Sequence, residues 1–184
     1  IMRMFVPVDQ QYHATFIQIP NLRGHAMQAF HPAKPMLSWG HLLFSDESVM
    51  ATRTTRHILL VRDPYTWVLA RARFFVSENF EANLAHLKGP QISAEALLNM
   101  MIFGIHTKAP PMLDIYQFNA AAWMGAGTVL YRYEDIVRHL KDIDSAASET
   151  FFCKLLDDCG IDVPADWKQR VVIGADRKQS ATAR

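Results

Sequence analysis

The sequence predicts an α/β domain with a mostly parallel central sheet flanked by helices. A continuous apolar run at residues 57–62 and a β-branched and aromatic run at residues 128–135 read as strands. Helical patterns lie between and after them, and this alternation is typical of a parallel sheet. The 184 residues are half hydrophobic, with a net charge of +1. We therefore expect one domain over residues 1–184.

The amino-terminal half carries the first strand signals. Residues 14–20 predict a short strand that Pro20 ends, and residues 35–44 form an apolar run around Gly40 that predicts a strand leading into a loop. The run at residues 57–62 has no polar alternation, which predicts a strand buried on both faces of the sheet.

Capping residues mark two of the helices. After the strand at residues 57–62, Asp63 suits an N-cap and Pro64 a first helical position, so a helix is expected over residues 65–80. Ser93 suits the N-cap of a second helix over residues 93–107.

Glycines and serines bound the later helices. Residues 111–126 predict a helix that ends near two glycines, Gly125 and Gly127. Residues 148–161 predict another, with Ser148 as its cap and Gly160 just past its end.

Arg62 stands where the first well-marked strand stops and a helix begins. In open α/β sheets, ligands collect beyond the carboxyl ends of the strands, and a helix N-terminus favours anions. A guanidinium at this point adds a bidentate grip on phosphate. The alternative is that Arg62 only pairs with Asp63 or Glu134.

Composition excludes several classes of protein. The balanced charge argues against nucleic-acid partners, and no apolar run approaches the ~20 residues of a transmembrane helix. The first residues lack a signal peptide, so a cytoplasmic location is expected. Cys153 and Cys159 lie six apart in one expected helix, which predicts free thiols. The spacing of the histidines predicts no metal site.

Four segments in order resemble the sulfotransferases that use 3′-phosphoadenosine 5′-phosphosulfate (PAPS) as donor. "HILLVRDPYTWVLARARFF" is similar to the 3′-phosphate-binding strand and helix of that family. "WGHLLF" falls where the family has its His-Leu segment, and "VLYRYED" and "FFCKLLDDCGID" resemble a later strand and helix. The resemblance covers roughly residues 36 to 162 and implies a P-loop NTPase-like fold.

The resemblance assigns roles to individual residues. His41 matches the histidine that takes the proton from the acceptor, a task that suits the pKa of imidazole. Arg62 matches the arginine that holds the 3′-phosphate of PAPS, and Tyr133 matches an aromatic residue at the adenine site. Arg184 matches an arginine in a late motif of the Arg-Lys-Gly type. Glu134 and Asp135 are expected to fix the strand–helix turn through backbone N–H groups.

The sequence departs from the family in two places. Eight residues after the arginine the family has a serine that also binds the 3′-phosphate, and here the position is Ala70. The loop that wraps the 5′-phosphosulfate has a poor counterpart in residues 16–30. The chain also begins at Ile1 and stops within a polar tail. We therefore expect a piece of a longer protein, with that loop upstream of Ile1.

The resemblance implies transfer of a sulfuryl group from PAPS to a hydroxyl or amine of a small-molecule or carbohydrate acceptor. Two alternatives stay open. One is a sulfotransferase-like binding or scaffold module that has lost donor binding, and the other is a P-loop kinase of small molecules or nucleotides. The sequence does not name the acceptor or the oligomeric state.

Overall fold

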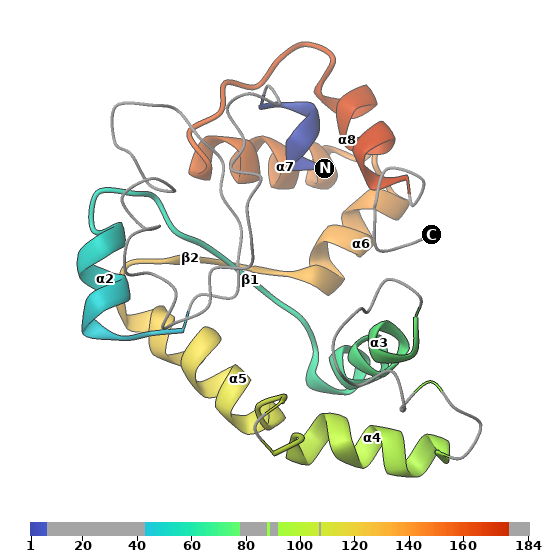
Figure 1. Cartoon of the computed structure of the whole chain (residues 1–184). Coiled ribbons are helices and arrows are strands. Elements are labelled where there is room, and N and C mark those ends of the chain that lie inside the picture. Colours follow the sequence, from blue (N-terminus) through green and yellow to red (C-terminus); the bar gives the residue numbers. More distant parts are fainter. Residues whose placement is uncertain (7–42, 78–87, 89–91, 107, 177–184) are drawn as a thin grey trace.

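A computed structural model describes residues 1–6, 43–77, 88, 92–106 and 108–176. Its centre is a pair of parallel strands, β1 (Ile58–Val61) and β2 (Val129–Arg132), with Ile58 opposite Val129 and Val61 opposite Arg132. Figure 1 shows α7 and α8 above the strand pair and α3, α4 and α5 below it. The expected parallel α/β arrangement is thus confirmed for these two strands.

The strands are less buried than their apolar sequences predict. Ile58 and Val129 pack against the core, and Tyr131 is buried, but Leu60 is 57% exposed. The prediction of a strand buried on both faces is wrong for β1. In the described part of the chain the sheet has two strands, so it offers few neighbours to cover Leu60.

Helix α3 (Pro64–Val76) begins as the sequence predicts. The Asp63 carboxylate accepts hydrogen bonds from the backbone N–H groups of Tyr65 and Thr66, and Pro64 occupies the first turn. Its buried residues Val68, Ala72 and Phe75 form one core cluster with Met101 of α4. The spacing of three to four residues places them on one face of the helix.

Helix α4 (Ala94–Phe103) starts at the predicted cap, because the Ser93 hydroxyl accepts from the N–H of Ala96. It ends early, at Gly104, whose φ of 83° and ψ of 175° are open to glycine alone. The predicted helix over residues 111–126 is two elements, α5 (Met112–Asn119) and the 3₁₀ helix η4 (Ala121–Gly125). Ala120 leaves helical geometry, with φ −128° and ψ −71°, and divides them.

Strand β2 ends three residues before the predicted boundary. Tyr133, Glu134 and Asp135 form the first turn of α6 (Tyr133–Lys141), so the assignment of these residues to a strand is wrong. Aromatic residues favour strands, but two acidic residues suit the positive end of a helix, and here the helix prevails. Arg138, His139 and Lys141 lie in its last turn, where the dipole favours cations.

A second core cluster lies on the opposite side of the strands. It contains Tyr131 of β2, Phe152, Leu155 and Leu156 of α7 (Ala146–Asp158), and Trp167 and Val171 of α8 (Trp167–Ala175). Ser145, three residues before the predicted cap Ser148, caps α7 through its hydroxyl. Ser148 is instead fully buried in the first turn, bonded to Ser145 and His139.

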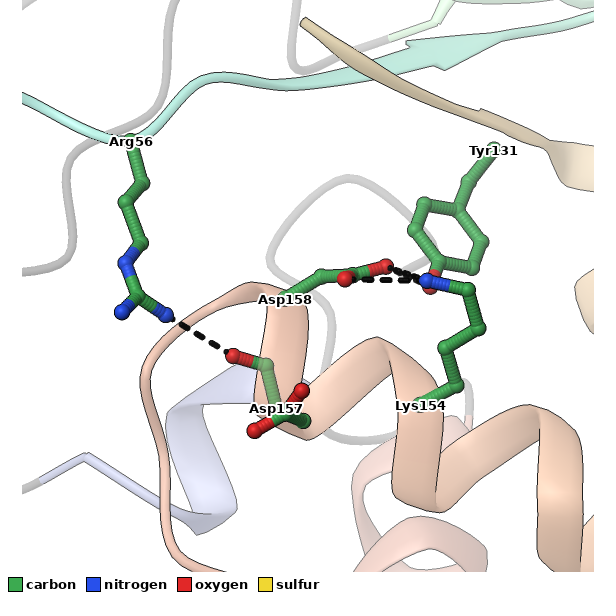
Figure 2. Close-up of polar contacts among 5 residues, drawn as sticks. All are labelled: Arg56, Tyr131, Lys154, Asp157 and Asp158. Atoms are coloured by element: carbon green, nitrogen blue, oxygen red, sulfur yellow. Dashed lines mark hydrogen bonds and ion pairs between the residues drawn. The ribbon is translucent and has the colours of Figure 1, made fainter.

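Polar contacts join β2 and the segment before β1 to the end of α7 (Figure 2). The Tyr131 hydroxyl donates to Oδ2 of Asp158 at 2.5 Å, and Nζ of Lys154 lies 2.8 Å from the same oxygen. Arg56 donates to the carbonyl of Asp157 at 3.0 Å. A cation at the carboxyl end of a helix satisfies carbonyl groups that have no partner within the helix.

Besides α6, the sequence pattern does not predict the 3₁₀ helix η1 (Met2–Met4) or the helices α2 (Asp46–Thr52) and α8. In α2 a capping box joins Ser45 and Ser48, where a serine replaces the usual Glu or Gln. Arg170 of α8 donates to the Met4 carbonyl and holds η1.

The strand predicted at residues 14–20 and most of that at 35–44 lie outside the described residues. Among the described helices none is long and apolar enough to cross a membrane.

Replacing Gly104 with alanine should destabilise the protein by about 2–4 kcal/mol. The φ of 83° strains any residue with a Cβ, and a Cβ built here would lie 2.7 Å from the Ala109 carbonyl oxygen. Urea unfolding measures the difference. Gly125→Ala is the matched control, because a Cβ at Gly125 meets nothing within 4 Å. Equal stability of the two variants would show that Gly104 is not conformationally required.

Candidate functional site

The carboxyl ends of β1 and β2 bring Arg62 and Tyr133 together. The Arg62 guanidinium carbon lies 4.4 Å from the centre of the Tyr133 ring, a cation–π contact. Its Nε donates to the Thr66 hydroxyl at 3.2 Å. The guanidinium is thus held in place by one ring and one hydroxyl. In the described part of the chain its two terminal nitrogens have no hydrogen-bond partner.

A groove of about 360 Å³ opens beside this pair. Its lining comes from the start of α3 and from one side of α6: Arg62, Thr66, Tyr133, Glu134, Val137, Arg138 and Lys141. Three cationic side chains face one carboxylate, so the groove carries net positive charge. This composition suits an anionic ligand that also has a flat or apolar part.

The N–H groups of α3 are not available to that ligand. The Asp63 carboxylate takes those of Tyr65 and Thr66, and the Asp63 carbonyl takes that of Trp67. The helix N-terminus that we expected to favour an anion therefore does not offer it these N–H groups. An anion in the groove would be bound by side chains, with Arg62 first among them.

Glu134 joins the two strand ends. Its Oε1 accepts from the backbone N–H of Asp63 at 2.9 Å and lies 3.4 Å from the Thr66 hydroxyl. The bond from Asp63, above all, lowers the pKa of the Glu134 carboxyl. The expectation that Glu134 fixes the turn through a backbone N–H is confirmed. Asp135 instead forms an ion pair with Arg138 at 3.0 Å.

The alternative assignment of Arg62, as an ion-pair partner of Asp63 or Glu134, finds no support among the described residues. Both carboxylates accept backbone N–H groups, and no ion pair joins either of them to Arg62. Arg62 turns toward Tyr133 and Thr66 instead. Its charge therefore remains open to a ligand.

Tyr116 of α5 is a supporting residue that the sequence did not reveal. Its hydroxyl donates to the Arg62 carbonyl at 2.7 Å, and its ring packs edge-on against Trp67. Burial and the nearby carboxylates of Asp63 and Glu134 raise its pKa to about 12, so the hydroxyl stays protonated as a donor. No local pattern connects residues so far apart in the sequence.

Ala70 does not line the groove, whereas Thr66, one helical turn earlier, does. The hydroxyl nearest Arg62 on α3 thus comes from a different position than in the family that the sequence resembles. His41 and Arg184 lie outside the described residues. Of the four predicted site residues, the structure therefore brings together Arg62 and Tyr133.

A second cavity, of about 590 Å³, lies at the amino ends of the strands. His57 and Trp123 line it and contact each other edge-on, with ring centres 5.1 Å apart. Burial, more than any other influence, lowers the pKa of His57 and favours its neutral form. Arg56 reaches the cavity but is bonded to the Asp157 carbonyl. Arg62 and Tyr133 lie at the other edge, at the carboxyl ends of the strands.

The described residues contain no group of three or more histidine, cysteine or acidic side chains placed to hold a metal ion. Cys153 and Cys159 are free thiols, and burial raises the pKa of Cys159 to about 11.

The sequence matches no known family model and no curated protein, and no solved structure matches the fold.

Glu134→Gln should lower the free energy of unfolding at pH 7. The folded protein holds the pKa of Glu134 below its unfolded value, so ionisation stabilises the fold above the unfolded pKa. That contribution disappears as the pH falls through the folded pKa of Glu134. The free energies of unfolding of the variant and the unchanged protein should then become similar. Urea titrations at pH 7, 5 and 3 measure this convergence. A difference that is constant over this range would contradict the proposed charge effect.

Proposed function

We propose that the chain is the nucleotide-binding part of a PAPS-dependent sulfotransferase. The observation that carries the proposal is the placement of Arg62 against Tyr133 beside a cationic groove. These are the two described residues to which the sequence resemblance assigns the 3′-phosphate and the adenine. The same proposal places the chain in the P-loop NTPase-like fold.

In this proposal the free nitrogens of Arg62 bind the 3′-phosphate of the donor. Arg62 covers one face of the Tyr133 ring, so the adenine would stack against the opposite face. Tyr133 is 39% exposed, which leaves part of its surface open to a ligand. Thr66 holds Nε of Arg62 and so aims the other two nitrogens at the groove.

The reaction is one displacement at sulfur. The acceptor oxygen or nitrogen forms a bond to the sulfur of PAPS as the bond from sulfur to the bridging phosphate oxygen breaks. Its electron pair remains with 3′,5′-ADP, and His41 takes the proton of the acceptor. Catalysis depends on positioning and on stabilising the leaving oxygen, with no covalent intermediate, as in phosphoryl transfer.

Two observations favour a second candidate, a nucleotide-binding module without turnover. Asp63 occupies the N–H groups of α3 that would otherwise contribute to phosphate binding, and Ala70 replaces the expected serine. A hydrogen bond to a charged acceptor is worth about 1.5–3 kcal/mol, so the loss of one weakens such a site without abolishing it.

Calorimetric titration with 3′,5′-ADP tests the donor site, with 5′-AMP as the matched ligand that lacks the 3′-phosphate. The unchanged protein should bind 3′,5′-ADP more tightly. Arg62→Ala should remove most of that difference, because a bidentate charged contact to phosphate is lost. Equal affinity of the unchanged protein for both ligands would refute the proposed site.

His41→Ala separates the enzyme from the binding module. The variant should bind 3′,5′-ADP as the unchanged protein does and should transfer sulfate from PAPS at least about 100-fold more slowly, because general-base catalysis contributes about 10²–10⁴. Radiolabelled PAPS with a panel of phenols, sterols and sugars measures the transfer. If the unchanged protein binds the donor and transfers nothing, the binding module is the better assignment. Full activity of the variant would exclude His41 as the base.

A further inference from the structure

We infer that Arg138 and Lys141 of α6 bind the same phosphate as Arg62 and supply the contacts that Ala70 cannot. This inference rests on the proposed function, because it names further residues for the 3′-phosphate of the nucleotide. It concerns a helix to which the sequence resemblance assigns no phosphate contact.

The geometry of α6 presents both cations to the groove. Tyr133, Val137 and Lys141 recur every four residues, and Glu134 and Arg138 lie beside them with the same interval. Residues four apart share one face of a helix, and these five all line the groove. Ile136 and Leu140 pack against the core cluster around Tyr131 and Phe152 instead. One face of α6 therefore lines the groove, and the other packs against the core.

The charges around the groove leave both cations available. Lys141 has no ion-pair or hydrogen-bond partner among the described residues. Arg138 pairs with Asp135 at 3.0 Å, but its side chain is 70% exposed, and such pairs contribute little. It can therefore turn to a phosphate at small cost. Glu134, the acidic residue of the groove, already accepts from Asp63.

A phosphate in the groove between α3 and α6 would meet cations from two sides. Arg62 approaches from the end of β1, and Arg138 and Lys141 approach from α6. A phosphate monoester carries close to two negative charges at neutral pH, so one guanidinium leaves part of that charge uncompensated. A neutral sugar or base would gain nothing from the two additional cations. Because the phosphate is charged and the sugar and base are neutral, we assign Arg138 and Lys141 to the phosphate.

The test compares Arg138→Gln, Lys141→Gln and the double variant by calorimetry with 3′,5′-ADP and with 5′-AMP. Each single change should weaken binding of 3′,5′-ADP about three- to tenfold, and the double change more, with little effect on 5′-AMP. Arg53→Gln and Lys168→Gln remove the same charges away from the groove and should change neither affinity. Circular dichroism checks that each variant is folded.

The outcomes distinguish this inference from the proposed function. If Arg62→Ala removes the preference for 3′,5′-ADP while the α6 variants keep it, the inference is overturned and the proposed donor site stands. Equal losses for both nucleotides would place the α6 cations on another part of the ligand and would also overturn the inference. If the unchanged protein does not prefer 3′,5′-ADP over 5′-AMP, both the inference and the donor site fail.

Discussion

The hydrogen bond from the Asp63 N–H to the Glu134 carboxylate is the contact on which the site depends. It joins residues 71 apart in sequence, and it ties the turn after β1 to the turn after β2. Parallel pairing sets Val61 beside Arg132, and this bond then fixes the two helices that leave the strands. Arg62 and Tyr133 each precede one of its partners, so the same bond brings the guanidinium onto the ring.

Local signals in the sequence predict one half of this arrangement well. The strand, the arginine, the Asp63 cap and Pro64 all act within a few residues, and each has a strong conformational preference. The apolar spacing in α3 likewise depends only on helix geometry. The sequence therefore predicts that Arg62 lies at the carboxyl end of β1. Parallel pairing of the strands then predicts that Arg62 lies beside the first residues after β2.

The other half depends on contacts that local patterns do not contain. The propensity of aromatic residues for strands hides the start of α6 at Tyr133, and Ser145 and Ser148 are equally good caps until burial decides between them. Tyr116 reaches the Arg62 carbonyl across 54 residues. Arg138 and Lys141 look like ordinary cations at a helix end until the groove places them beside Arg62.

The parallel pairing also determines when the groove can form. Its two walls follow strands that pair only after α3, α4 and α5 have been made, because these helices lie between β1 and β2 in the chain. Closing so long a loop is entropically costly, and folding that depends on such distant contacts is slow. During synthesis α3 can pack against α4 early, whereas α6 emerges last of the groove's elements. The groove is therefore completed late, and the chain up to residue 128 holds Arg62 without the Tyr133 ring that it contacts in the folded protein.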